Sequence, residues 1–180
     1  RELARQYDTP EKIASYLSQY ISNNEYFYTL QPPAISNNSL DEFFFDTKSG
    51  FCEHYASTIA FLMRAAGVPT RLVTGYMGAE LNPETGHYAV YQYDAHAWME
   101  YWSESRGWVR FDPTAMVSPE RVLQGLNRAL SSEDSAYLGS ALSLNQYRSI
   151  AVLNYIRLKL DALDYQWTQC RGAGGGGCAT

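Results

Sequence analysis

The chain has 180 residues, with 14 Lys or Arg against 19 Asp or Glu, and a net charge of −5. This length is enough for one hydrophobic core without help from disulfides. The acidic balance excludes a basic surface field that would attract a nucleic-acid backbone, and no run reaches the roughly 18 apolar residues that cross a bilayer.

The first predicted element is an amphipathic helix that begins after Thr9. Thr9 is a favoured N-cap residue and Pro10 suits the first helical position. Apolar residues then recur with helical spacing at Ile13, Ala14, Leu17, Tyr20 and Ile21. We expect this stripe to pack on the core. Residues 26–30 predict a short strand or an extended aromatic arm.

A short helical turn over residues 40–45 is expected to bring three phenylalanines into the core. Residues 46–50 form the loop that leads to a central helix over residues 52–66. That helix has a broad apolar face, made by Tyr55, Ala56, Ile59, Ala60, Leu62, Met63 and Ala66. Gly67 suits a left-handed helix end, and Pro69 prevents continuation of the helix.

Strands are predicted next, at residues 70–76 and 87–93, with a polar loop at residues 77–86 between them. Two aromatic-rich runs follow, at residues 95–102 and 106–112, and we interpret them as a β-hairpin. Their short polar connector is 103–105.

The last part of the chain predicts a helix at 118–130, a linker at 131–144 and a long helix at 145–169. Cys170 and Cys178 lie in a glycine-rich tail that resembles a linker or a cloning remnant. We therefore expect a single domain over residues 1–168, with residues 169–180 as a tail that is either disordered or a cloning remnant. Cys52 stays free even if the other two cysteines pair.

Cys52 stands at the predicted start of the central helix. The first turn of a helix has unpaired N–H groups and a partial positive charge, so a thiol there ionises more easily than a free thiol and has donors for an oxyanion. This is a natural place for a nucleophile. The alternative is an inert core cysteine, because cysteine is among the most buried residue types.

The predicted hairpin proposes a partner for this thiol. If its loop is centred on Glu104, His96 lies directly opposite Asp112, with Cβ atoms about 4.5–5.5 Å apart. A carboxylate at that distance accepts an imidazole N–H. A slip of one residue in the register would send one of the two side chains to the other face of the sheet.

These segments together resemble the transglutaminase-like superfamily, in its bacterial membrane-anchored branch. The resemblance is carried by the order Cys52, His96, Asp112 and by the residues around them. The matching segments are 50–57, 64–71, 73–76, 95–98, 107–115 and 118–122. It is strong over residues 40–125 and weak in the flanks.

The resemblance implies an α+β fold with a papain-like, transglutaminase-like core, in which the helix that carries the nucleophile packs on an antiparallel sheet with flanking helices. Cys52 would be the nucleophile, His96 the acid and base, and Asp112 the residue that orients the imidazole. It also implies a periplasmic domain of an inner-membrane protein. Any membrane contact would run through flanking segments that this chain lacks.

Other residues fit catalytic roles less well. His54 lies two positions after Cys52, which rotates it about 200° away on a helix, and a role in stabilising the loop suits it better. His87 is either at a cleft mouth or an ordinary surface histidine. Trp98 and Trp102 share a face with His96 on a regular strand, either as a dry wall beside the imidazole or as core packing.

The sequence predicts no cofactor and no metal. Oxygen ligands at Glu80, Asn82, Glu84 and Asp94 match no calcium loop, and solvated polar loops look the same. Cys52, His54 and His96 do not have zinc-ligand spacing.

The resulting hypothesis is an acyltransferase of the protein-glutamine gamma-glutamyltransferase type. Cys52 attacks a glutamine carboxamide of a protein or peptide, His96 protonates the departing ammonia, and a primary amine resolves the thioester. In a peptidase or amidase of the papain type, water replaces the amine. A binding module without activity is the third alternative.

Overall fold

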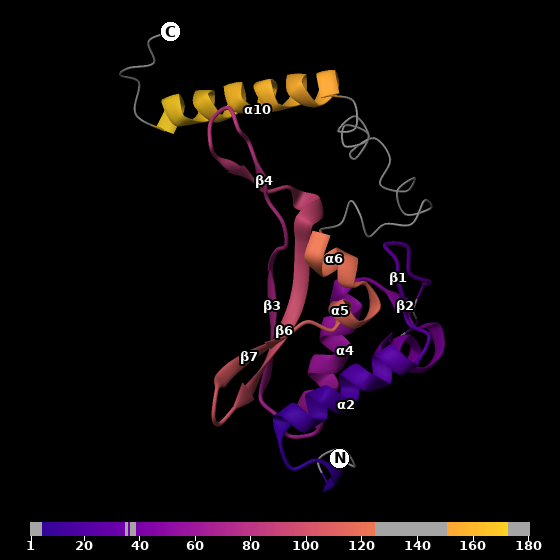
Figure 1. Cartoon of the computed structure of the whole chain (residues 1–180). Helices are drawn as coiled ribbons and strands as arrows, with labels where there is room; N and C mark the ends of the chain where they lie inside the picture. Colours follow the sequence, from indigo (N-terminus) through magenta and orange to yellow (C-terminus); the bar gives the residue numbers. More distant parts are fainter. Residues whose placement is uncertain (1–4, 35, 37–38, 125–150, 173–180) are drawn as a thin grey trace. The chain divides into compact units, whose positions relative to one another are not determined.

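The structure, a computed structural model, describes residues 5–34, 36, 39–124 and 151–172 (Figure 1). The chain divides into two compact units. The first comprises Arg1–Gly78 and Gln92–Asp134, and the second comprises Ala79–Tyr91 and Ser135–Thr180. Each unit is described by itself below, and the single catalytic domain that the sequence predicts stays a prediction.

Helix α2 (Pro10–Asn23) opens the first unit as the sequence predicts. The hydroxyl of Thr9 accepts a hydrogen bond from the Lys12 N–H at 3.4 Å, and Pro10 is the first helical residue. The buried face consists of Ile13, Ala14, Leu17 and Ile21. These residues belong to the hydrophobic core together with the apolar face of the central helix.

The segment before the central helix is more irregular than predicted. A short helix, α3 (Ser39–Asp41), continues into a π-helical turn, η1 (Glu42–Thr47). Phe43 and Phe44 are buried, but Phe45 is 59% exposed, so the expectation of three buried phenylalanines is wrong for Phe45. Three consecutive residues of a helical turn point in different directions, and one of them must leave the core.

Helix α4 (Cys52–Ala65) is the central helix, and it begins at Cys52. It packs against α2 and against two strands of the sheet (Figure 1). Its buried residues are Cys52, Tyr55, Ala56, Thr58, Ile59, Ala60 and Met63. Gly67 follows the helix with φ at 88°, which confirms the predicted left-handed position.

The sheet of the first unit is antiparallel, with the strand order β3-β6-β7. Its strands are β3 (Thr70–Tyr76), β6 (Ala95–Ser103) and β7 (Gly107–Phe111). The predicted hairpin is confirmed, but its register is wrong. Ser103 pairs with Gly107, so the turn is centred on Ser105 and not on Glu104. Gly107, with φ at 71°, supplies the left-handed residue at the end of this turn.

Two short helices complete the described part of the first unit. They are α5 (Thr114–Val117), which the sequence did not predict, and α6 (Pro119–Gln124), the start of the helix predicted at 118–130. The remainder of that helix, the predicted linker at 131–144, residues 145–150 of the last helix and residues 173–180 of the tail lie outside the described residues.

The second unit consists of a small hairpin and a long helix, α10 (Ala151–Gly172), so residues 169–172, which the sequence assigned to the tail, are helical. The hairpin strands are β4 (Glu80–Leu81) and β5 (Tyr88–Ala89). The strand predicted at 87–93 is therefore wrong beyond Ala89, because Gln92–Asp94 forms a 3-10 turn, η2. The predicted polar loop at 77–86 contains β4, and a tight turn at Gly86, whose N–H donates to the Asn82 carbonyl, closes the hairpin.

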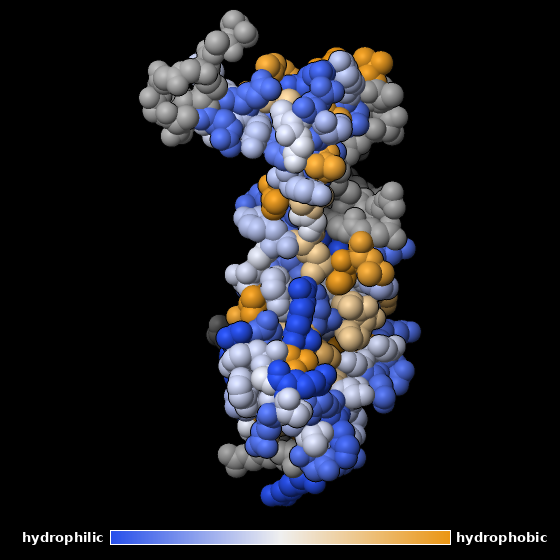
Figure 2. Space-filling view, turned by 60° about the vertical axis from the view of Figure 1, so that its left-hand side comes forward, coloured by the Kyte–Doolittle hydropathy of each residue, from blue (hydrophilic) through white to orange (hydrophobic). Residues whose placement is uncertain are grey.

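The surface of α10 carries hydrophobic side chains among hydrophilic ones (Figure 2). Leu160 and Leu163, for example, are each 61% exposed. Within the part of the chain that the structure describes, no helix combines the length and the apolar character needed to span a membrane.

Candidate active site

Cys52 is the first residue of α4, and its side chain is buried. The residue before it, Phe51, is extended and provides no side-chain cap for the helix. No side-chain acceptor from that residue therefore competes for the N–H groups at the helix start. This matches the electrostatic setting that the sequence predicts for a nucleophile.

The backbone that leads to Cys52 is held by parallel pairing with a distant strand. In this pairing β1 (Phe27–Tyr28) lies beside β2 (Ser49–Gly50), with Tyr28 opposite Gly50. The hydroxyl of Tyr55, one turn into α4, donates to the Phe27 carbonyl at 2.7 Å. The helix that carries the thiol thus fastens the two strands that precede it.

Gly50 is required in this loop because there is no room for a side chain. A Cβ atom at this position would lie 2.8 Å from Cγ and 2.9 Å from Cβ of His54. His54 itself packs between the rings of Phe43 and Phe51. Burial lowers its pKa. His54 therefore holds the loop, which agrees with the structural role preferred for it from the sequence.

His96 and Asp112 are in contact, as predicted, although the hairpin register differs. His96 Nε2 lies 2.8 Å from Asp112 Oδ2, and the His96 side chain is fully buried. The second oxygen of Asp112 accepts the N–H of Thr114 at 3.2 Å. Because the true register differs from the predicted one by two positions, both residues keep the same face and meet diagonally beyond the last paired residues.

The thiol of Cys52 lies beside the imidazole, which links the helix start to the hairpin. Nε2 is engaged by Asp112, and the other ring nitrogen, Nδ1, is buried without a hydrogen-bond partner among the described residues. The sulfur is nevertheless close enough for the two groups to shift each other's pKa. The thiol and the imidazole are therefore neighbours in the fold.

The surroundings favour a thiolate beside an imidazolium. Burial raises the pKa of Cys52, but His96, the Ala97 backbone N–H and the Arg121 charge outweigh it, so the net shift is downward. Burial lowers the pKa of His96, but Asp112 and Cys52 raise it by more. For Asp112, burial raises the pKa, yet the contacts with His96, Thr114 and Arg110 lower it overall. All three shifts stabilise the charged forms.

A cavity of about 630 Å³ opens beside Cys52 and His96. Its lining is mostly apolar, and it lies within the first unit. The apolar and aromatic side chains that line it are Tyr28, Leu30, Phe51, Ala56, Leu72, Tyr76, Tyr93, Ala95 and Ala97. A concave, mostly apolar lining with a few polar groups beside the thiol is typical of a substrate-binding site.

Arg121 also lines this cavity, and sequence reasoning missed it. It is only 1% exposed, which is rare for arginine. One guanidinium nitrogen, Nη2, donates to the Ala95 carbonyl at 2.9 Å. It lies in a family-matching segment, 118–122, but the sequence assigned it no role, because an arginine in a predicted surface helix is ordinarily solvated.

The structure shows which side chains pack against Trp98, Trp102 and His87. Trp98 stacks beside His96, with ring centroids 6.2 Å apart, and the Arg110 guanidinium lies 4.3 Å from its ring centroid. It therefore forms a wall beside the imidazole, whereas Trp102 packs edge-on against Trp108. His87 belongs to the second unit, where its ring stacks on Tyr165 at 4.2 Å.

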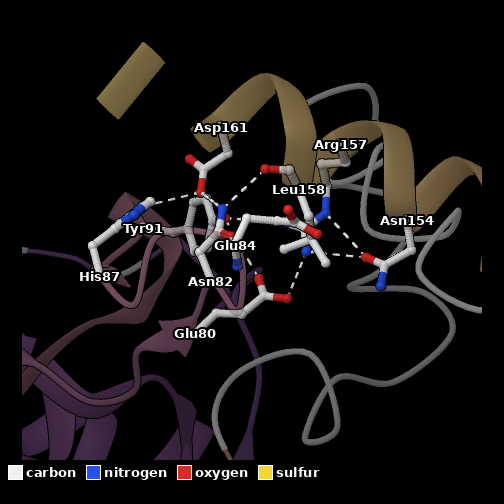
Figure 3. Close-up of polar contacts among 9 residues, drawn as sticks. All are labelled: Glu80, Asn82, Glu84, His87, Tyr91, Asn154, Arg157, Leu158 and Asp161. Carbon is white, nitrogen blue, oxygen red and sulfur yellow. Dashed lines mark hydrogen bonds and ion pairs between the residues drawn. The ribbon is translucent and has the colours of Figure 1, made fainter. Parts of the chain in front are cut away.

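The side chains considered as calcium ligands do not form one cluster. Within the second unit, Glu80 pairs with Arg157, Asn82 donates to Asp161, and Glu84 pairs with Lys159 (Figure 3). Asp94 belongs to the first unit. Among the described residues, no three His, Cys, Asp or Glu side chains form a group able to hold a metal ion.

Comparison with known proteins gives consistent matches. The model of the family described as "Transglutaminase-like superfamily" matches residues 1–113. A protein-glutamine gamma-glutamyltransferase of Pseudomonas aeruginosa is 48% identical over 167 residues, covering 92% of this chain and 25% of that protein. The uncharacterized protein YebA of Bacillus subtilis is 32% identical over 120 residues, covering 63% of this chain and 16% of YebA.

A solved structure agrees. The crystal structure of the periplasmic domain of TgpA from Pseudomonas aeruginosa matches with a TM-score of 0.69 and 49% identity, over 72% of this chain and 45% of that one. The α+β fold, with the central helix on an antiparallel sheet, is thus confirmed as transglutaminase-like. The chain spans a quarter of the length of the curated Pseudomonas relative. The protein belongs to the transglutaminase-like superfamily.

Proposed function

We propose that this chain is the catalytic part of a protein-glutamine gamma-glutamyltransferase. The observation that carries the proposal is the arrangement of His96, which bonds to Asp112 through Nε2 and lies beside the Cys52 thiol at the start of α4. This is the geometry of a nucleophile, a base and an orienting carboxylate. The name of the Pseudomonas relative supports glutamine as the acyl donor.

The reaction follows from the charges at the site. The Cys52 thiolate attacks the carboxamide carbon, and the Cys52 N–H donates to the developing oxyanion. The His96 imidazolium gives its proton to the leaving ammonia, which produces a thioester on Cys52. Neutral His96 then takes a proton from a primary amine as that amine attacks the thioester, and an amide product leaves.

A protein or peptide with glutamine is the proposed donor, and a lysine or a small amine is the acceptor. The likeness to a domain described as periplasmic supports a periplasmic location. Resolution of the thioester by water would make the same site an amidase or a peptidase, because the choice of acceptor depends on water exclusion and cleft shape.

An amine-incorporation assay tests the proposal. The chain is incubated with a glutamine-bearing protein and a dansylated primary amine, and covalent fluorescence and free ammonia are measured together. We expect labelling in step with ammonia release, and neither product with Cys52→Ala. Ammonia release without labelling would establish the amidase instead. The variant Cys170→Ala/Cys178→Ala, which leaves Cys52 as the only thiol, is the matched control and should retain both products.

A further inference from the structure

The oxyanion in this mechanism needs a second donor. The backbone N–H of Cys52 supplies one hydrogen bond, whereas acyl-transfer sites typically direct two donors at the oxygen that becomes negative. The second donor must lie beside the sulfur, on the wall of the same cavity, and it must keep its proton at neutral pH.

Tyr28 meets the requirement of position. It pairs with Gly50, two residues before Cys52, and its side chain lines the cavity that contains Cys52 and His96. Its backbone is fixed on both sides. The Phe27 carbonyl accepts the Tyr55 hydroxyl at 2.7 Å, and the Thr29 N–H donates to the Gly50 carbonyl at 2.9 Å. The phenol is therefore anchored to the loop that positions the nucleophile.

Arg121 places a buried positive charge on the same cavity wall. Its Nη2 atom bonds to the Ala95 carbonyl, but Nε and Nη1 are buried without a hydrogen-bond partner among the described residues. A guanidinium is charged at every accessible pH, and leaving its donors unpaired in a buried site is costly. The guanidinium shares this cavity wall with the Tyr28 phenol and is close enough to act on it.

Cys52 and Arg121 both affect the pKa of the Tyr28 hydroxyl. Burial raises the pKa of Tyr28, and so does the Cys52 charge. The Arg121 guanidinium and the Cys52 backbone N–H act on the same phenol in the opposite direction without reversing the shift. The hydroxyl thus stays protonated at neutral pH, and its oxygen lies near the N–H that serves as the first oxyanion donor.

We propose that the Tyr28 hydroxyl is the second donor to the oxyanion and that the buried Arg121 guanidinium holds the phenol in place. This assignment rests on the proposed acyl transfer. As the Cys52 sulfur bonds to the carbonyl carbon, the π electron pair moves to oxygen, which accepts hydrogen bonds from Tyr28 and from the Cys52 N–H. Tyr28 transfers no proton. The pair returns when the C–N bond breaks, and His96 protonates the ammonia.

Acylation by an activated ester tests Tyr28 separately from the amine acceptor. The chain, with Cys170 and Cys178 replaced by alanine, is mixed with p-nitrophenyl acetate, and p-nitrophenolate release is followed. We expect Tyr28→Phe to slow acylation by about 10²–10³-fold. Alkylation of Cys52 by iodoacetamide has no oxyanion, and its rate should stay within about twofold of the parent.

Tyr20→Phe is the matched control. It removes a phenol hydroxyl from α2, where the ring stacks on Phe44 outside the cavity. Its acylation rate should equal that of the parent. An unchanged or faster acylation rate in Tyr28→Phe overturns the assignment. A parent chain that alkylates rapidly but is never acylated overturns both this assignment and the proposed function. If the parent acylates normally but incorporates no amine, only the proposed transferase function fails.

A double-mutant cycle tests the positioning role of Arg121. Arg121→Lys keeps the charge but loses the planar donor set, so we expect slower acylation with a normal pH dependence of Cys52 alkylation. Because Arg121 acts through Tyr28, the double variant Tyr28→Phe/Arg121→Lys should acylate within about twofold of Tyr28→Phe. A further loss in the double variant as large as the loss from Arg121→Lys alone would show that Arg121 acts independently.

Discussion

At the residue scale, the reactivity of Cys52 is set by three groups that come from two separate elements of the chain. His96 and the Ala97 backbone N–H come from β6, and Arg121 comes from α6. Each of them lowers the pKa of the thiol, whereas burial raises it. Because these contributions outweigh burial, the thiol ionises below its ordinary range while His96 holds its proton above its own.

The pH dependence of alkylation checks this pairing. In a chain with Cys52 as the only thiol, the iodoacetamide rate rises as the thiolate forms. A lowered pKa moves this rise below the value of about 8.5 typical of a free thiol. His96→Ala removes the imidazolium that lowers the pKa, so its profile should shift to higher pH. Coincident profiles for the two proteins would contradict the pairing.

Asp112 should contribute less than the two residues that exchange bonds and protons. Asp112→Ala leaves Cys52 and His96 in place but removes the acceptor that orients the ring through Nε2. We expect kcat to fall on the order of 10⁴-fold, against about 10⁶-fold for Cys52→Ala or His96→Ala. Steady-state amine incorporation measures both losses.

Glu100→Gln is the control for loss of a carboxylate on the same sheet. Glu100 forms an ion pair with Arg71 at 2.6 Å, and the Arg71 side chain is half exposed. Exposed pairs of this kind contribute little, so activity should be unchanged. Equal losses in Glu100→Gln and Asp112→Ala would show that the effect of Asp112 is not specific to His96.

At the element scale, the start of α4 is fixed by close packing of the preceding loop. Gly50→Ala places a methyl group against His54, whose Cβ belongs to the first turn of the same helix. The loop or the helix start must move. We expect the free energy of unfolding to fall by about 1–3 kcal/mol and acylation to slow with it.

Thermal unfolding and ester acylation test this prediction together. Ser49→Ala, the adjacent residue in β2, introduces no such contact and is the control, with an expected change within about 0.5 kcal/mol. A Gly50→Ala variant with the stability and the activity of the parent would show that the loop accommodates a side chain at this position.

The elements that the sequence predicted well are those with a strong local signal. Thr9 and Pro10 mark the start of α2, and Gly67 marks the end of α4, because capping and left-handed positions restrict residue choice. The contact between His96 and Asp112 was also predicted from the hairpin. That contact prediction is correct although the predicted turn position is wrong, because a register shift of two residues leaves both side chains on the same face of the sheet.

Other features depend on contacts that no local pattern encodes. Tyr28 pairs with Gly50 across 22 residues, and Arg121 reaches the Ala95 carbonyl across 26 residues of the chain. Strand β5 is shorter than predicted because the tight turn at Gly86 comes just before it and the η2 turn begins soon after it, after Tyr91. The juxtaposition of Cys52 with His96 came from family resemblance, since local pattern does not determine how a helix docks on a sheet.

At the scale of the whole molecule, the second unit is held together by buried polar contacts. Asn82 is 1% exposed, and its amide donates to the Leu158 carbonyl and to Asp161, both at 2.9 Å (Figure 3). Arg157 joins Tyr91 and Glu80 to the same helix. These contacts attach the β4-β5 hairpin to α10.

Asn82→Leu should loosen this attachment. It leaves the Leu158 carbonyl and Asp161 without their amide donor, which costs about 1–3 kcal/mol of local stability. Amide hydrogen exchange in Glu80–Leu81 and Tyr88–Ala89 should accelerate, while alkylation of Cys52 in the first unit keeps its rate. Glu84→Ala removes a more exposed ion pair with Lys159 and should change exchange much less. Equal acceleration in both variants would contradict a central role for Asn82.

The most direct test of the account is to trap the acyl-enzyme. The chain with Cys52 as its only thiol is mixed with a glutamine-containing peptide in the absence of amine, quenched in acid and analysed by intact-mass and peptide mass spectrometry. The account predicts an adduct equal to the peptide minus ammonia, located on the peptide that contains Cys52 and absent from both Cys52→Ala and His96→Ala. Release of ammonia without this adduct, or an adduct of equal yield in His96→Ala, would contradict a thioester mechanism driven by the thiolate and the imidazolium.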